Sequence, residues 1–204
     1  NFQNVDASVL STGVSITGSV AANAITGGSG NDVIDGAGGA DIIHAGAGND
    51  AVTYRGTEAL IDGATDNNTL VMRAQANVNL GATDQTSGDS TAVSNFQNVD
   101  ASALNAGQAI SIVGSAGVNV LTGGAGNDTI DGAGGSDIID GGGGDDSISY
   151  RGTENSIDGG SGNNTLLMQA AATVNLGNAD VTTGDGVLVS NFINVDASAL
   201  NTGV

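Results

Sequence analysis

Glycine, asparagine and aspartate recur at a fixed spacing in two stretches of this chain. Residues 123–131 follow the nine-residue pattern Gly-Gly-x-Gly-x-Asp-x-U-x, in which U is a large apolar residue, and further copies follow at 132–140 and 141–149. The same triplet lies 96 residues earlier, at 27–53. Glycine lets the backbone turn through positive φ and brings carbonyl oxygens close together. Together with the carboxylate of the Asp, these oxygens suit calcium rather than a soft metal.

The nonapeptide resembles the calcium-binding repeat of the RTX (repeats-in-toxin) family of secreted bacterial proteins. Six near-consecutive copies carry this resemblance. It implies an all-β fold, a right-handed parallel β-roll or β-solenoid, in which two nonapeptides make one turn. It also implies that each Ca²⁺ ion lies on one edge of the roll, between half-turns that are two nonapeptides apart along the chain.

The resemblance further implies a ligand set for each ion. One half-turn supplies the carbonyls of positions 2 and 4 and the Asp of position 6, and the other supplies the carbonyls of positions 1 and 3 and its own Asp. Two sites then have two carboxylates each, and we expect them to bind calcium most tightly. They place Gly28, Gly30 and Asp32 against Ala45, Ala47 and Asp50, and Gly124, Gly126 and Asp128 against Gly141, Gly143 and Asp146.

Other positions carry one carboxylate and one amide. Asp41 and Asp137 face Asn23 and Asn119 one turn earlier, and Asp50 and Asp146 also face Asn68 and Asn164 one turn later. Fewer charged ligands predict either weaker calcium sites or sites that side-chain hydrogen bonds close instead. For every Asp at position 6, the alternative to a metal ligand is an Asx turn that caps a loop.

Composition limits the class of protein. The chain has 35 Gly, no Pro, no Cys and 2% aromatic residues, which excludes an ordinary large globular core. Its 39% of hydrophobic residues is too high for a typical disordered tail, so a narrow solenoid fits best. A formal net charge of −19 leaves little to neutralise phosphates, so we expect no nucleic-acid partner. No apolar run is long enough to insert into a membrane.

The nine-residue period extends beyond the obvious copies. In the second stretch, residues 114–176 divide into seven blocks, and the eighth position is apolar in the first six of them: Leu121, Ile130, Ile139, Ile148, Ile157 and Leu166. Residues 18–80 give the same series. This pattern predicts short strands at positions 7–9 and a solenoid that is continuous along the chain. Inward ladders should run through Ile130, Ile148 and Leu166 on one sheet, and through Ile139 and Ile157 on the other.

A longer repeat contains the nonapeptides. The segment at 1–8 returns at 95–102 and, with one change, at 191–198. We therefore divide the chain into unit 1 (1–94), unit 2 (95–190) and the start of a third unit (191–204), and interpret it as a window of a longer array. Counting 168–176 and 177–189 as half-turns gives ten half-turns per unit, an even number that would start each unit on the same edge.

Three further groups of residues attract functional hypotheses. Arg55 and Arg151 could each replace a calcium ion by pairing with Asp41 and Asp137 one turn earlier, although an exposed Arg–Glu pair is an equal alternative. His44 corresponds to Asp140 in unit 2, so we interpret it as a surface residue. The phenylalanines are expected to belong to the core: Phe2, Phe96 and Phe192.

The sequence favours a structural function. We expect a calcium-binding repeat region of a secreted, extracellular or cell-surface bacterial protein that supports adhesion, cell coating or a biofilm matrix and self-associates or stacks on neighbouring repeats. The alternative is an accessory domain of a secreted enzyme or toxin. An ice-binding solenoid is disfavoured because no outward Thr ladder is present. We expect no enzyme, because the chain has no Cys, a single His and no Ser-His-Asp set.

Overall fold

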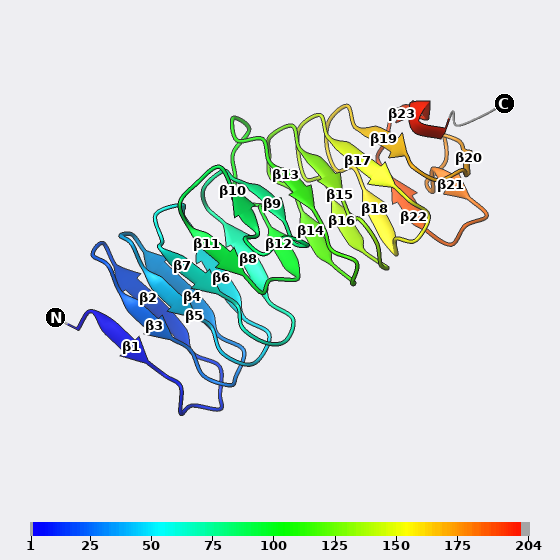
Figure 1. Cartoon of the computed structure of the whole chain (residues 1–204). Helices are drawn as coiled ribbons and strands as arrows, with labels where there is room; N and C mark the ends of the chain where they lie inside the picture. Colours follow the sequence, from blue (N-terminus) through cyan, green and yellow to red (C-terminus); the bar gives the residue numbers. More distant parts are fainter. Residues whose placement is uncertain (1, 201–204) are drawn as a thin grey trace. The chain divides into compact units, whose positions relative to one another are not determined.

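The computed structural model describes residues 2–200, which form 23 short β-strands and one 3₁₀ turn. The chain divides into two compact units, Asn1–Asp100 and Ala101–Val204. Each unit is a stack of short parallel strands, which Figure 1 shows in sequence colours. The division into sequence units at 94 and 190 remains a prediction.

In the first compact unit the chain alternates between two parallel sheets. The first sheet has the order β1 (Asn4–Asp6), β3 (Ala24–Thr26), β5 (Ile42–His44), β7 (Leu60–Asp62) and β11 (Ala92–Ser94). The second has the order β2 (Ser15–Ser19), β4 (Val33–Ala37), β6 (Ala51–Tyr54), β8 (Thr69–Met72) and β12 (Asn98–Asp100). Because consecutive strands fall in opposite sheets, each pair of strands completes one turn.

The second compact unit repeats this arrangement. One sheet contains β13 (Ser111–Val113), β15 (Thr129–Asp131), β17 (Ser147–Tyr150), β19 (Thr165–Met168) and β23 (Asn194–Asp196). The other contains β14 (Val120–Thr122), β16 (Ile138–Asp140), β18 (Ser156–Asp158) and β22 (Leu188–Ser190). These bounds confirm strands at positions 7–9 of the nonapeptide.

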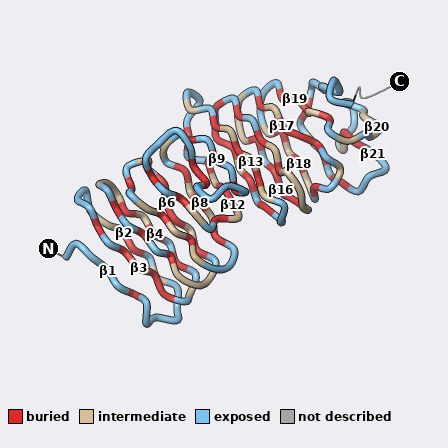
Figure 2. The backbone as a smooth tube through the Cα atoms, in the orientation of Figure 1, coloured by how far each residue is buried: buried red, intermediate tan, exposed pale blue. Residues whose placement is uncertain are grey.

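The core consists of the eighth-position ladders. Ile130 pairs with Ile148, and Ile148 with Leu166, while Ile139 pairs with Ile157 in the other sheet. All five side chains are at most 1% exposed. Figure 2 shows the resulting regular alternation of buried and exposed residues along each turn. The all-β parallel solenoid predicted from the nine-residue period is therefore confirmed.

The expected half-turns at 168–176 and 177–189 are wrong. This stretch contains an antiparallel hairpin of β20 (Thr173–Val174) and β21 (Thr182–Thr183), and its counterpart in the first compact unit is β9 (Asn77–Asn79) with β10 (Thr86–Ser87). The two segments pair with each other, so together they form one excursion between two strands of the stack. As a result β1 and β12 lie in different sheets, and nine half-turns, not ten, separate them.

The parallel stack resumes after each hairpin. β18 pairs with β22 and β19 with β23, so the third copy of the repeated segment still belongs to the solenoid. A 3₁₀ turn, η1 (Ser198–Leu200), follows. The end of the expected third unit, residues 201–204, lies outside the described residues. Among residues 2–200, no helix is long and apolar enough to cross a membrane.

Candidate metal centre

The aspartates of position 6 form hydrogen-bonded ladders along one edge of each unit. Asp32 Oδ1 accepts the N–H of Val14 at 2.9 Å, and Asp50 Oδ1 accepts the N–H of Asp32 at 2.8 Å. In the second unit, Asp146 Oδ1 accepts the N–H of Asp128 at 2.7 Å. Each bond joins residues 18 positions apart, so the structure brings the two aspartates of each expected two-carboxylate site onto adjacent turns.

The second carboxylate oxygen lies beside a carbonyl of the next turn. A Cβ placed on Gly27 would meet both Asp32 Oδ2 and the carbonyl oxygen of Ala45. A Cβ on Gly123 would meet Asp128 Oδ2 and the carbonyl of Gly141 in the same way. The space that these glycines leave free is therefore lined by a carboxylate oxygen from one turn and a carbonyl oxygen from the next. This is the part of the expected ligand set that comes from position 1.

A third such place lies one turn further along the second unit. A Cβ on Gly141 would lie 2.6 Å from Asp146 Oδ2 and 2.7 Å from the carbonyl oxygen of Gly159. Here the carboxylate oxygen is buried and has no hydrogen-bond partner. Among the described residues, Oδ2 of Asp41 and Oδ2 of Asp50 are buried without a partner as well. A buried carboxylate oxygen without a donor is costly unless a cation binds it, so the residues present fit a hard metal ion.

The same carboxylates have unusually high pKa values. Burial raises the pKa of Asp146 to about 7, and the neighbouring charge of Asp128 adds to the effect. Burial also raises the pKa of Asp50 and of Asp137 to about 6. The pKa of Asp41 and of Asp128 is raised too, again chiefly by burial. These groups are therefore poorly stabilised as anions by the protein alone, as expected of residues that a divalent cation would neutralise.

The expected carbonyl ligands have several roles in this structure. The carbonyls of Gly28 and Gly124 each accept an N–H from the next turn, from Ala47 at 3.0 Å and from Gly143 at 2.8 Å. A carbonyl oxygen has two lone pairs, so this bond leaves one available. The assignment of these carbonyls, and of those of Gly30 and Gly126, as calcium ligands remains a prediction.

The asparagines of position 6 close their turns with side-chain hydrogen bonds. Asn68 Oδ1 accepts the N–H of Asp50 at 2.9 Å, and its Nδ2 donates to the carbonyls of Gly63 and Thr65 at 2.7 and 2.9 Å. Those carbonyls belong to positions 1 and 3, which the resemblance assigns to an ion. In the turn of Asn68, the structure thus supports the interpretation that side-chain hydrogen bonds close the Asn-containing sites in place of an ion.

A second edge carries Asp41 and Asp137. Asp41 Oδ1 accepts the N–H of Asn23, and Asp137 Oδ1 accepts the N–H of Asn119, both at 2.8 Å. Asn23 Nδ2 donates to the carbonyl of Gln3 at 2.7 Å. Both edges of the solenoid therefore hold buried carboxylates in the same arrangement.

The hypothesis that Arg55 and Arg151 pair with Asp41 and Asp137 is wrong. Each guanidinium instead makes a bidentate pair with the Asp of position 9. Arg55 Nε and Nη2 donate to Asp35 at 2.9 and 2.7 Å, and Arg151 makes the same two bonds to Asp131. Asp35 and Asp131 are partly exposed, whereas Asp41 and Asp137 are buried.

Sequence reasoning missed the role of Glu58 and Glu154. Both are buried, and Glu58 accepts the N–H of Arg55 at 3.0 Å and that of Thr57 at 3.1 Å. Glu154 makes the equivalent bonds in the second unit. In these two blocks position 6 is not an Asp, and the Glu at position 5 closes the turn by hydrogen bonds without a metal ion. The only available signal was the absence of Asp at position 6 in these two blocks.

The remaining expectations concern His44 and the phenylalanines. His44 lies at the surface, 3.5 Å from Asp62 Oδ2, which confirms its interpretation as a surface residue. Phe96 and Phe192 are buried as expected. Phe2 is not: its side chain is fully exposed.

Within residues 2–200, no three His, Cys, Asp or Glu side chains gather into a metal site, but the expected sites depend on two carboxylates and several carbonyls.

Comparison with known protein families identifies the nonapeptide repeats of this chain. The family model of the RTX calcium-binding nonapeptide repeat matches in four copies, over residues 17–52, 113–148 and 152–167. No curated protein matches the chain. The matched repeats and the parallel solenoid that they build identify this chain as an RTX calcium-binding repeat protein.

Proposed function

We propose that this chain is a structural repeat region of a secreted or cell-surface bacterial protein, and that calcium binding drives its folding. The observation that carries the proposal is the set of buried carboxylate oxygens without a partner, those of Asp41, Asp50 and Asp146. Without a cation these groups oppose folding, and with one they tie adjacent turns together. Binding free energy then becomes folding free energy.

Three features support a structural rather than a catalytic role. The two units repeat the same side chains at the same positions, as in an array, whereas an active site needs a unique constellation. The single His is a surface residue paired with an Asp. The carboxylates with raised pKa values are all position-6 aspartates of the calcium edges. We therefore propose that this region is not an enzyme.

The net charge suggests how folding is controlled. Nineteen net negative charges disfavour compaction of the metal-free chain. Extracellular calcium modules bind at about 10⁻⁴–10⁻³ M, so such a chain would stay unfolded inside a cell and fold outside it. This behaviour suits export by a type I system followed by use in adhesion, cell coating or a biofilm matrix. An accessory domain of a secreted enzyme or toxin would behave in the same way, and no observation here favours it.

The test is circular dichroism during a calcium titration. We expect a cooperative rise of β-structure at millimolar calcium that a chelator reverses and that magnesium does not reproduce, because magnesium demands a tighter octahedral geometry. Asp128→Ala combined with Asp146→Ala should move the midpoint to higher calcium. Full β-content in excess chelator would show that calcium is not the folding switch.

A further inference from the structure

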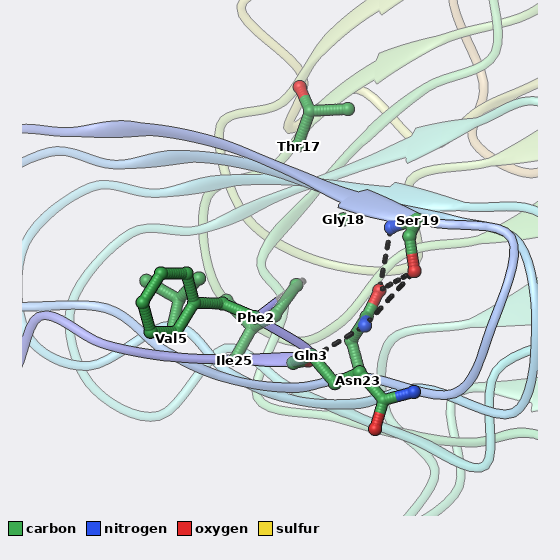
Figure 3. A pocket seen from close by; sticks show the side chains of 8 residues that line it. All are labelled: Phe2, Gln3, Val5, Thr17, Gly18, Ser19, Asn23 and Ile25. Atoms are coloured by element: carbon green, nitrogen blue, oxygen red, sulfur yellow. Dashed lines mark hydrogen bonds between the residues drawn. The ribbon is translucent and has the colours of Figure 1, made fainter.

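The backbone N–H of position 2 donates to the side chain of position 6 in some turns of this solenoid. The N–H of Gly124 donates to Oδ2 of Asp128 at 2.7 Å. Figure 3 shows the equivalent bond in the first unit, in which the N–H of Ser19 donates to Asn23 Oδ1 at 2.7 Å. The same bond joins Gly28 to Asp32 and Ser115 to Asn119. We call these four turns closed turns, because the position-6 side chain is bound by its own turn.

In other turns the same N–H donates to the residue that precedes the turn. Asp140, at position 9 of the preceding block, accepts the N–H of Gly142 at 2.9 Å, and Asp131 accepts that of Ala133 at 2.9 Å. This contact is an Asx turn. It recurs from Ala37 to Asp35, from Ala64 to Asp62 and from Gly160 to Asp158. We call these five turns open turns, and in all of them the φ of position 2 is positive, from 60° to 87°.

The residue at position 9, and not glycine, separates the two kinds of turn. Ala133 adopts a φ of 65°, although its Cβ makes this region unfavourable. Gly124 has no such penalty, and yet its φ lies outside that region. The open turn of Ala133 follows Asp131, whereas the closed turn of Gly124 follows Thr122. A Thr hydroxyl accepts an N–H of this kind more weakly than an Asp does, so the N–H binds the position-6 side chain instead.

The turn of Asp50 shows that the conformation itself frees the carboxylate. Its position 2 is Gly46, which follows His44 and Ala45 and has a φ of 107°. Glycine reaches this conformation without strain, so no preceding Asp is needed here. Oδ2 of Asp50 is nevertheless one of the buried oxygens without a partner. A free Oδ2 therefore accompanies a positive φ at position 2, whatever holds that φ in place.

The state of the turn decides what a cation would meet. In the open turns of Asp41 and Asp146, Oδ2 is buried and has no hydrogen-bond partner. In the closed turns of Asp32 and Asp128, Oδ2 already accepts an N–H. A cation at a closed turn has to displace that donor or share the oxygen with it, whereas at an open turn the oxygen needs a partner.

We propose that position 9 is a positioning residue for calcium: an Asp there takes the N–H of position 2 and leaves the carboxylate of the following turn free to bind the ion. The positioning residues are then Asp35, Asp131 and Asp140, which act on Asp41, Asp137 and Asp146. The proposal rests on the calcium-driven folding proposed above and deepens it, because it names the residues that prepare individual ligands.

The test opens a closed turn at Thr122. Thr122→Asn supplies an Asx acceptor without adding charge, so the N–H of Gly124 should leave Asp128. The matched control, Thr122→Gln, carries the same amide on a side chain one methylene longer, which does not form an Asx turn. The calcium midpoint for folding, read by circular dichroism, should fall by about tenfold for the Asn variant, the effect of roughly one hydrogen bond. It should stay near that of the parent for the Gln variant.

Crystal structures of the calcium-loaded variants give a second readout. The φ of Gly124 should be positive in Thr122→Asn and unchanged in Thr122→Gln. The same φ in both variants would refute the dependence on position 9. A changed φ with an unchanged calcium midpoint would refute its part in calcium binding. Thr26→Asn and Thr26→Gln repeat the comparison at Gly28, so a single variant that folds poorly does not decide the outcome.

The two proposals fail in different ways. If calcium does not control folding, the parent shows its full β-content in chelator, while the φ of Gly124 still tests the dependence on position 9. If that dependence is wrong, the parent still folds on calcium, and the Asn and Gln variants behave alike.

Discussion

The change Asp146→Asn separates the cost of the buried carboxylate from its benefit as a ligand. Asp146 Oδ1 accepts the N–H of Asp128, and an Asn could keep that bond as Asn68 does for Asp50. The new Nδ2 could donate to carbonyls of its own turn, again as in Asn68. The variant therefore removes a charge from the turn while its hydrogen bonds can be retained.

The magnitude follows from the raised pKa. A shift from 3.8 to about 7 corresponds to an upper limit of roughly 4 kcal/mol at pH 8. Asp146 is buried, but the effective dielectric constant of about 20 that applies to ionised groups in real proteins reduces this upper limit to about 2 kcal/mol. Metal-free Asp146→Asn should therefore be more stable than the parent by about 2 kcal/mol. Its calcium midpoint should move upward on the order of tenfold, because one carboxylate ligand is lost.

The assay is osmolyte-induced folding in chelator, followed by a calcium titration, both read by circular dichroism. The matched control is Asp145→Asn, an equal charge change at the exposed neighbour, whose carboxylate accepts the N–H of Asn163 at 2.7 Å. The control should change neither quantity by much. A variant that folds less readily in chelator, or that binds calcium like the parent, would refute the idea that Asp146 is a ligand held at a cost.

Three further predictions concern pH, the turn glycines and the core. The folded-state pKa values of Asp50, Asp137 and Asp146 lie above the ordinary 3.8, so the metal-free fold is most stable below about pH 4 and loses stability as pH rises through 6 to 7. Circular dichroism in chelator should therefore show more β-structure at pH 5 than at pH 8. An unchanged or opposite trend would contradict this prediction. Gly123→Ala should abolish the calcium response of its turn, since its Cβ would lie 2.6 Å from Asp128 Oδ2, whereas Gly134→Ala, with Ala116 Cα at 3.9 Å, should fold normally. Ile148→Ala should lower the free energy of unfolding in calcium by about 2–5 kcal/mol, measured by urea denaturation, and Ile138→Ala, at a residue that is 43% exposed, by much less.

The regular part of the fold was predictable because one period fixes both sheets. A nine-residue repeat with an apolar eighth position places Ile130 and Ile148 in one sheet and Ile139 in the other, and the structure has this register. The aspartates of position 6 were predictable for the same reason, since 18 residues separate adjacent turns. The unpartnered Oδ2 atoms of Asp41, Asp50 and Asp146 were not predictable from that spacing, because Asp32 and Asp128 have the same spacing and their Oδ2 atoms accept the N–H groups of Gly28 and Gly124.

The irregular parts were not predictable from the period. The hairpin of β20 and β21 arises because two segments without eighth-position apolar residues pair with each other, and a count of residues cannot show this. The partner of Arg151 depends on the direction of a long side chain, which selects Asp131 on the strand over Asp137 in the turn. Glu154 closes its loop from position 5, where the nonapeptide specifies no residue.

The change from Asp to Asn also explains where a ladder of ions can end. An ionised Asp only accepts hydrogen bonds, so a position-6 Asp such as Asp50 brings acceptors but no donor into the space between turns, which favours a cation there. Asn68 brings two N–H donors into that space and uses them on the carbonyls of Gly63 and Thr65. Asn164 acts similarly, donating to the carbonyl of Asn191 at 3.1 Å. One atom exchanged in a side chain, nitrogen for oxygen, thus supplies an internal hydrogen-bond donor at the position where an Asp offers only a carboxylate oxygen.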